Sequence, residues 1–341
     1  MKFRTMYKKF IAPKSHTVHA DMLNTAVNTG ATMNKLDNAT RIVYAKEIQF
    51  KAMPNMRFFQ FASVKTELGV QPGLTISMMT YDNLALGGTL TEGVPMVGKS
   101  LSSSMKSITV AEKGNAVKVS ELLLQSSFDD IMATATTLLA RDYATVLDLE
   151  LRDKALSNAT TIFGRKTGAA KITARANISE ENPLTMATVK DAVEILATNN
   201  APKFEGNYYI CFVHPHQSRD LRDDSAWINA SNYGNPSQLF TGEIGRIDDV
   251  RFIETTLMCN GAAGTDDPAY KAALHEAGAE KTDVYQSVLF GENYYGIAFG
   301  LPMELRDEPP KDFGREHGLA WYSIWGADLL QSENGVVIET C

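Results

Sequence analysis

The sequence predicts an α+β fold organised around one long helix. Residues 127–157 contain no Gly or Pro, begin with Ser127 as an N-cap and place Lys154 near the end, where the helix dipole favours a cation. Apolar residues recur at helical spacing, and Leu147 and Leu151 widen their stripe. The spaced positions are 128, 131, 135, 138, 146, 149 and 156. Strands rich in β-branched residues flank the helix, and no βαβ unit repeats. Taken alone, such a helix also fits an ordinary α-rich protein.

The residues at the start of the chain predict an extended arm. Residues 1–40 mix Lys, Asn, Thr and Ala without periodicity, so they are expected to have little structure of their own. An aromatic cluster follows Pro54 and contains Phe58, Phe59 and Phe61. We expect this cluster to be buried, either in this subunit or in a neighbour.

A two-stranded excursion is predicted before the long helix. Leu74–Tyr81 and Ser107–Val119 are both rich in β-branched residues, which is typical of strands. The connection between them is rich in Gly and Ser and poor in large apolar residues. Because it cannot pack on itself, we expect it to lie across something else.

Residues after the long helix predict a mixed α/β segment. Thr185 is expected to cap a helix over 186–197, with Val189, Val193 and Leu196 on its buried face. The continuous apolar run at 207–213 predicts a buried central strand, and 214–240 is predicted to be a polar segment. Further strands are expected at 250–254, preceded by turn residues Gly242 and Gly245, and at 284–290, 296–299, 319–325 and 336–338.

Composition excludes several classes of function. The net charge of −7 argues against general affinity for nucleic-acid backbones, which requires clustered Lys and Arg. Three widely spaced cysteines form no disulfide framework, which fits a reducing compartment. No stretch is long and apolar enough to span a membrane, and the N-terminus lacks a signal peptide's apolar run. We therefore expect a soluble protein made inside the cell, with no membrane partner.

Two motifs suggest chemistry, but their context argues against both. Gly93–Ser100 matches the phosphate-loop pattern, yet it follows a poor strand, leads into a strand and contains Pro95, which removes a backbone donor. Cys211, His214 and His216 could suggest a metal, but no second ligand cluster has suitable spacing, and turn residues that cap a strand explain them. We predict no catalytic residue, cofactor or metal.

Two features of the sequence can be compared with known families. The first is the order of its segments: an arm, an excursion, a long helix, a mixed α/β segment and returning strands. The second is a series of short motifs. The motifs are Leu90–Pro95, Lys113–Ser120 running into Phe128, Phe212–Pro215, Asp220–Asp224, Trp227–Ala230, and Gly242–Ile247 with Val250–Thr255. Together they resemble the major capsid proteins of tailed bacteriophages, which have the Hong Kong 97-type fold. More narrowly, they resemble the coat proteins related to that of coliphage N-four. The likeness covers most of residues 40–341.

This resemblance implies a division of the chain into domains. Residues 1–65 would be the N-terminal arm, and 66–118 the extended β-hairpin loop that overlaps the adjacent subunit. Residues 119–160 and 286–341 would form the peripheral domain with its spine helix, and 161–285 the axial α/β domain.

The resemblance also implies partners and a location. Copies of the chain would form hexamers and pentamers of an icosahedral shell that encloses double-stranded DNA. No long scaffolding domain precedes the arm, which implies a separate scaffolding protein, together with a portal, and decoration proteins are candidate further partners. The shell would assemble in the host cytoplasm and remain in the virion. A Lys–Asn cross-link like that of the archetype cannot be assigned to Lys99 or Lys106.

Candidate contacts between subunits come from the loop, the aromatic cluster and a mixed charge run, which is usually a solvated face. They are Leu90, Glu92, Gly93, Pro95, Lys99, Phe58, Phe59, Arg219, Arg222, Asp223 and Asp224. Two alternatives remain: an encapsulin-like cargo shell of the same fold, and a nucleotide-binding enzyme that uses Gly93–Ser100.

Overall fold

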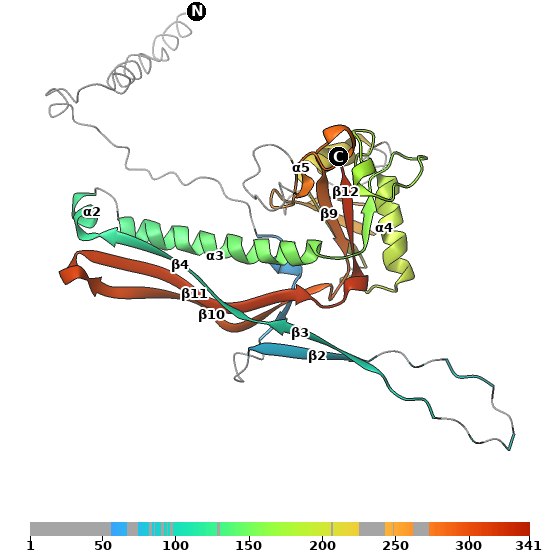
Figure 1. The fold of residues 1–341 in the computed structure, drawn as a ribbon, viewed down its shortest axis with the longest axis horizontal. Helices are drawn as coiled ribbons and strands as arrows, with labels where there is room; N and C mark the ends of the chain where they lie inside the picture. The colour runs from blue at the N-terminus through green and yellow to red at the C-terminus, as the bar shows by residue number, and fades with distance from the viewer. Residues whose placement is uncertain are drawn as a thin grey trace, which may run out of the picture. The chain divides into compact units, whose positions relative to one another are not determined.

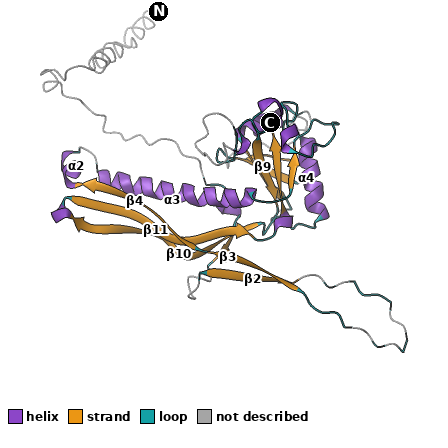
Figure 2. Ribbon diagram, viewed as in Figure 1, coloured by secondary structure: helices purple, strands orange, loops and turns teal. Residues whose placement is uncertain are grey.

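Two β-sheets and a two-stranded hairpin form the framework of the protein (Figures 1 and 2). The computed structural model describes residues 56–66, 74–81, 84, 86–89, 92–93, 95, 98–127, 130–205, 207–224, 243–247, 249–261 and 273–341. The predicted arm lies almost entirely outside this range, as do Leu90, Phe128, Gly242 and Trp227–Ala230. The α+β class predicted from the sequence is confirmed.

The long helix is α3, Ile131–Leu156, and it is shorter than predicted. At 1.5 Å per residue its 26 residues span about 39 Å. The N-cap is Asp130, whose carboxylate accepts the N–H of Ala133 at 3.1 Å. Ser127 instead ends a separate helix, α2 (Glu121–Ser126), because its backbone is extended. Predicting a single helix from Ser127 was therefore wrong at this end.

The buried stripe of α3 is also shifted relative to the predicted one. Leu138 is 48 % exposed, whereas Leu139, one position on, is 2 % exposed. The buried apolar side chains are Ala135, Leu139, Leu147, Leu151, Ala155 and Leu156. A helix covered on several sides has no single sharp periodicity, which explains the error.

A four-stranded sheet packs against α3 in the order β1-β10-β11-β4. Its strands are β1 (Ser63–Lys65), β10 (Tyr295–Lys311), β11 (Glu316–Leu329) and β4 (Ala111–Ser120). β10 is far longer than the predicted 296–299. It contains Pro302, Pro309 and Pro310, which are tolerated because, among the described strands, β1 pairs with this edge only at residues 296–298.

The predicted return strand over 107–119 is in fact two strands. β3 (Ser103–Thr109) pairs antiparallel with β2 (Thr75–Tyr81) to form the hairpin. After Val110 the chain enters β4, which pairs with β11 in the other sheet. A continuous run of strand-forming residues does not reveal that its pairing partner changes.

A six-stranded sheet has the order β5-β12-β9-β6-β8-β7. Its strands are β5 (Thr161–Phe163), β12 (Gly335–Thr340), β9 (Tyr285–Phe290), β6 (Tyr209–Val213), β8 (Val250–Glu254) and β7 (Glu243–Ile247). β6 is central and completely buried, as predicted. Gly245 is not a turn residue but lies within β7, which pairs antiparallel with β8.

Helices α4 (Met186–Thr198) and α5 (Pro215–Asp223) pack on one side of this sheet. α4 buries Val189 and Leu196 against β6 and β12, as its periodicity predicts. α5 was missed, because 214–240 was predicted to be a polar segment without a helix. Pro215 at the first helical position was the available signal.

One hydrophobic core joins α3 to both sheets. It includes Leu151 from α3, Trp325 from β11, and Phe212 and Val288 from the six-stranded sheet. β12 pairs with β9 in that sheet, although the sequence grouped residues 286–341 with the long helix. The predicted domain boundaries themselves stay a prediction.

Candidate assembly surface

The β2–β3 hairpin is anchored at its base and exposed along its length. Ile76 and Ile108 pair across the strands and pack with Ala298 of β10 in a small core. Toward the far end, Met79 and Met105 pair across the strands and are 59 % and 62 % exposed. The hairpin therefore has a fixed base, while its distal apolar side chains remain in solvent.

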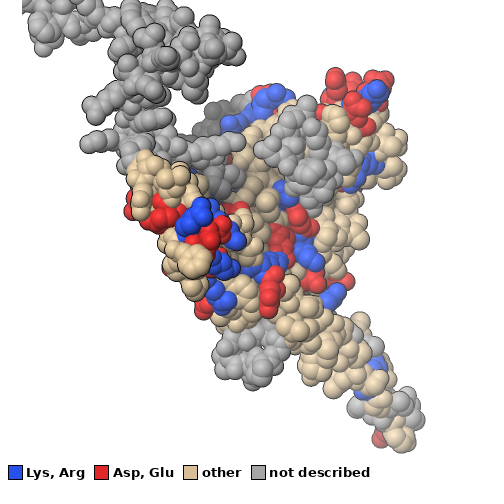
Figure 3. Space-filling model, turned by 60° about the vertical axis from the view of Figure 1, so that its left-hand side comes forward, with Lys and Arg blue, Asp and Glu red and all other residues tan. Residues whose placement is uncertain are grey.

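Beyond the hairpin strands, the described residues between 84 and 102 form an extended connection that is even more exposed. Leu86 is 94 % and Leu101 72 % exposed. A Cβ added at Gly87 would meet no heavy atom of the described chain within 4 Å. Figure 3 shows that residues without charge dominate the surface of this part, whereas acidic and basic side chains are interspersed over the body. We call residues 74–109 the assembly loop.

A large apolar side chain left in water forgoes stabilisation. Complete burial of a Leu or Met contributes about 1.5–3 kcal/mol. Contiguous exposed apolar surface on a soluble protein marks an interaction site more often than chance exposure does. The arrangement is suited to burial against another surface.

The predicted contact residues of the loop lie together on this exposed connection. Glu92, Gly93, Pro95 and Lys99 are all exposed. The Lys99 ammonium donates to the carbonyl oxygen of Leu86 at 2.6 Å, bridging the outgoing and returning segments. Their role in contacts between subunits stays a prediction.

The phosphate-loop pattern at Gly93–Ser100 has the context expected from the sequence. The residues after Ser100 enter β3 at Ser103 and form no helix. The described residues after Ser100 therefore supply no helix N-terminus, which a phosphate loop needs to hold its ligand.

Phe58 and Phe59 lie inside their own chain, which is one of the two locations expected for the aromatic cluster, and their role in contacts between subunits stays a prediction. Phe58 is completely buried, with its ring centroid 4.3 Å from that of Phe212, and Tyr295 donates to its carbonyl oxygen at 2.7 Å. Phe59 packs half-buried against Phe299. The buried Asp148 carboxylate accepts the Phe59 N–H at 3.0 Å, so α3 fixes this turn.

The charged residues of the predicted mixed run lie on or next to α5. Asp224 accepts the N–H of Met186 at 3.0 Å and so caps α4. Arg219 and Arg222 have side chains that are 67 % and 55 % exposed, and Asp223 is exposed as well. Asp224 thus has a role within the subunit, and Arg219 and Arg222 pair with Asp220 and Glu254. A role of the four predicted residues in contacts between subunits stays a prediction.

A second exposed apolar surface was missed by sequence reasoning. Phe313, in the turn between β10 and β11, is fully exposed, and Leu122 of α2 is 77 % exposed. The turn and α2 are tied together, because Glu121 donates its N–H to the Arg315 carbonyl and its carboxylate contacts His317 at 2.8 Å. Charged residues flank Phe313 in the sequence, so no apolar pattern indicated an exposed apolar surface there. The neighbouring Gly314 was a signal for a turn.

The His-Pro-His motif caps a helix and not a strand. His214 is the N-cap of α5, and burial lowers the pKa of its imidazole to about 4. Burial also raises the pKa of the Cys211 thiol far above its usual range. In the described part of the chain no group of three or more His, Cys, Asp or Glu side chains could hold a metal ion.

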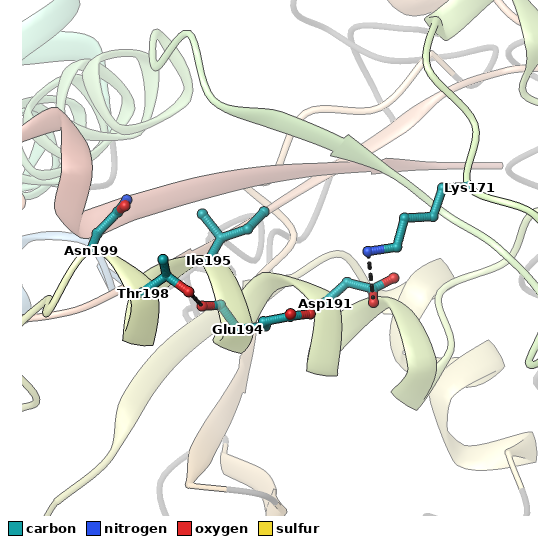
Figure 4. Close-up of a pocket in the computed structure, with 6 residues that line it drawn as sticks. All are labelled: Lys171, Asp191, Glu194, Ile195, Thr198 and Asn199. Carbon is teal, nitrogen blue, oxygen red and sulfur yellow. Dashed lines mark hydrogen bonds and ion pairs between the residues drawn. The ribbon is translucent and has the colours of Figure 1, made fainter.

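A shallow pocket of about 260 Å³ lies along α4 (Figure 4). The Lys171 ammonium is 3.2 Å from the Asp191 carboxylate, which also binds Arg165 at 2.7 Å. These cations lower the pKa of Asp191, with the Arg165 hydrogen bond as the largest cause. Glu194, Ile195, Thr198 and Asn199 complete the lining. Arg165 and Lys171 together neutralise the Asp191 carboxylate. Among the helices described, none is long and apolar enough to cross a membrane.

Solved structures with the same fold define the class of protein. The cyanophage Pam1 capsid asymmetric unit matches with a TM-score of 0.72 at 17 % identity, covering 91 % of this chain and 98 % of that chain. The capsid of Ralstonia phage GP4 matches with 0.68 at 16 % identity, covering 92 % and 98 %. The capsid of cyanophage P-SCSP1u matches with 0.66 at 14 % identity, covering 91 % and 95 %. The fold is that of phage capsid proteins.

The sequence supports the same assignment. A family model described as phage capsid protein matches residues 163–331, about half of the chain. No curated protein matches the sequence. The chain is a phage capsid protein with the Hong Kong 97-type fold, as its motifs predicted. The narrower resemblance to the N-four group stays a prediction.

Proposed function

We propose that this chain is the coat subunit of a phage head, a structural protein without enzymatic activity. Copies of it form hexamers and pentamers of an icosahedral shell around double-stranded DNA. The family match and the fold support this role. The observation that carries it is the assembly loop, whose Leu86 and Leu101 are exposed in the subunit.

In this proposal the assembly loop of one subunit lies on the surface of the next. Such a contact joins two different surfaces, and contacts of this kind close into rings when the rotation permits. The distal apolar side chains of the loop then become buried, and obligate interfaces of this type often exceed roughly 2,000 Å². Each subunit would both extend a loop and receive one.

The proposal also includes the partners and location that the sequence implied. A separate scaffolding protein and a portal take part in assembly in the host cytoplasm, decoration proteins are further candidate partners of the shell, and the shell remains in the virion. The net charge of −7 is compatible with a shell that encloses DNA without binding its backbone tightly.

The test is a variant whose loop is cut at a point that the structure defines. Tyr81 and Ser103 are paired opposite each other, so Asn-Gly can replace 82–102 as a two-residue hairpin turn. The deletion ends at residue 102, so β3, which begins at Ser103, stays whole. We expect a soluble subunit with unchanged circular dichroism that forms no shells by electron microscopy.

A matched control changes the loop without removing its apolar side chains. Gly87→Ala adds a methyl group that meets no described atom of the isolated subunit and keeps Leu86 and Leu101 in place, so it should still give shells. Shells of normal size from the shortened variant would overturn the role assigned to the loop. DNA in particles purified from infected cells supports the phage coat, whereas a protein cargo would support the encapsulin-like alternative.

A further inference from the structure

The ring of His214 closes the first turn of α5. Its Nδ1 accepts the N–H of His216 at 3.2 Å, and the Gln217 side-chain oxygen accepts the N–H of His214 at 3.2 Å. This reciprocal cap satisfies donors that a helix start leaves open. Because Nδ1 must accept, the imidazole has to be neutral with its proton on Nε2. The Asn260 amide lies 3.1 Å from Nε2 and can present either end to it.

α5 is more than a surface helix, because both of its ends hold other elements. The side chain of Gln217 is completely buried and donates to Thr340 of β12 at 2.9 Å and to the Tyr285 carbonyl of β9 at 3.3 Å. At the other end, Asp224 caps α4 through the N–H of Met186. Loosening the first turn therefore affects the contacts of α5 with β9 and β12.

The surroundings of His214 oppose a positive charge. Burial is the largest cause of its lowered pKa, and His216 on the same helix lowers it further. Glu254 at the end of β8 acts in the opposite direction, but its carboxylate is already engaged by the hydroxyl of Ser218 at 2.5 Å. The helix N-terminus itself also disfavours a cation.

His216 adds a second titrating ring at the same place. It stacks on Tyr285 of β9, with ring centroids 4.2 Å apart, and burial lowers its pKa as well. Asp220 lies 3.8 Å from its Nδ1 and favours the charged form, while Arg219 disfavours it. Asp283 and Cys341 are the remaining titratable groups that act on Tyr285.

We propose that His214 is an acid-sensitive latch: when its ring takes up a proton, it loses the acceptor that caps α5, and the helix separates locally from β9 and β12. The device belongs to the folded chain and does not depend on the proposed shell. The cap is intact above about pH 6.5, the ordinary pKa of histidine. Its stabilisation is lost as pH falls toward about 4, where the folded form is itself protonated.

Native-state hydrogen exchange on the purified full chain tests the latch. Exchange of the α5 amides is measured at pH 7 and pH 4.5 and corrected for intrinsic rates, with the α3 amides of 139–151 as an internal reference. A difference of one pKa unit for His214 between the closed and the open form changes the opening constant of α5 about tenfold. The His214 ring is only partly buried, which reduces the effect of its full pKa shift. We therefore expect the opening constant of α5 to rise about tenfold at the lower pH relative to the reference.

The decisive control is His214→Asn, because Asn caps a helix without titrating in this range. This variant should show no more acid loosening of α5 than of α3. If it fails to fold, His214→Ser provides the same comparison. Equal protection of wild-type α5 at the two pH values would overturn the latch, and so would an acid response that persists in the non-titrating variant.

Discussion

Replacing Leu86 with Ser separates the stability of the subunit from its assembly. Leu86 is 94 % exposed in the subunit, so the change removes almost no buried area from the folded chain. We expect the free energy of unfolding of the unassembled subunit to stay within about 0.5 kcal/mol of the wild type. If the side chain is buried on a neighbouring copy, each contact loses about 1.5–3 kcal/mol. That loss lowers the association constant of each contact by roughly tenfold to a hundredfold.

The assay measures the concentration at which shells first appear, by light scattering and sedimentation, together with thermal unfolding of the dissociated subunit. We expect Leu86→Ser to raise that concentration at least about tenfold with an unchanged Tm. Leu139→Ala is the contrasting control, because Leu139 is 2 % exposed and its truncation should cost about 2–5 kcal/mol of subunit stability. Assembly of Leu86→Ser at the wild-type concentration would refute the reasoning. So would a loss of Tm like that of Leu139→Ala, because it would place Leu86 inside its own chain.

Three further changes test other parts of the account. Arg175→Gln leaves the buried Glu339 carboxylate without its cation. The free energy of unfolding in urea should fall by about 2–3 kcal/mol, less than for a fully buried pair because Arg175 is partly exposed. An unchanged urea midpoint would contradict this. Gly326→Ala would place a Cβ in collision with the Thr109 carbonyl oxygen at the end of β3, so it should lower Tm by several degrees, and a wild-type Tm would contradict this close approach of the two strands. Lys99→Ala should leave equilibrium dialysis against ATP unchanged, since we expect no binding; ATP binding that disappears with Lys99 would restore the nucleotide-binding alternative.

Local patterns predicted the elements whose environment is uniform. β6 is a short run of apolar residues buried on both faces, and α4 has one apolar face against one sheet. In both cases the residue pattern and the final environment match directly. The assembly loop could also be predicted, because a stretch with few large side chains cannot form its own core.

Elements decided by distant partners could not be predicted. Ser127 and Asp130 are both good N-cap residues, and only the extended backbone at Ser127 separates α2 from α3. The chain changes partners at Val110, which no periodicity reveals. Phe313 is flanked by charged residues in the sequence, and its exposure depends on the turn between the long strands β10 and β11.

A reconstruction of assembled particles by electron cryo-microscopy tests the central claim most directly. The account predicts that density for residues 84–102 of one subunit lies against a neighbouring copy and covers Leu86 and Leu101. Density for the same residues folded against their own subunit, with both leucines buried there, would contradict it.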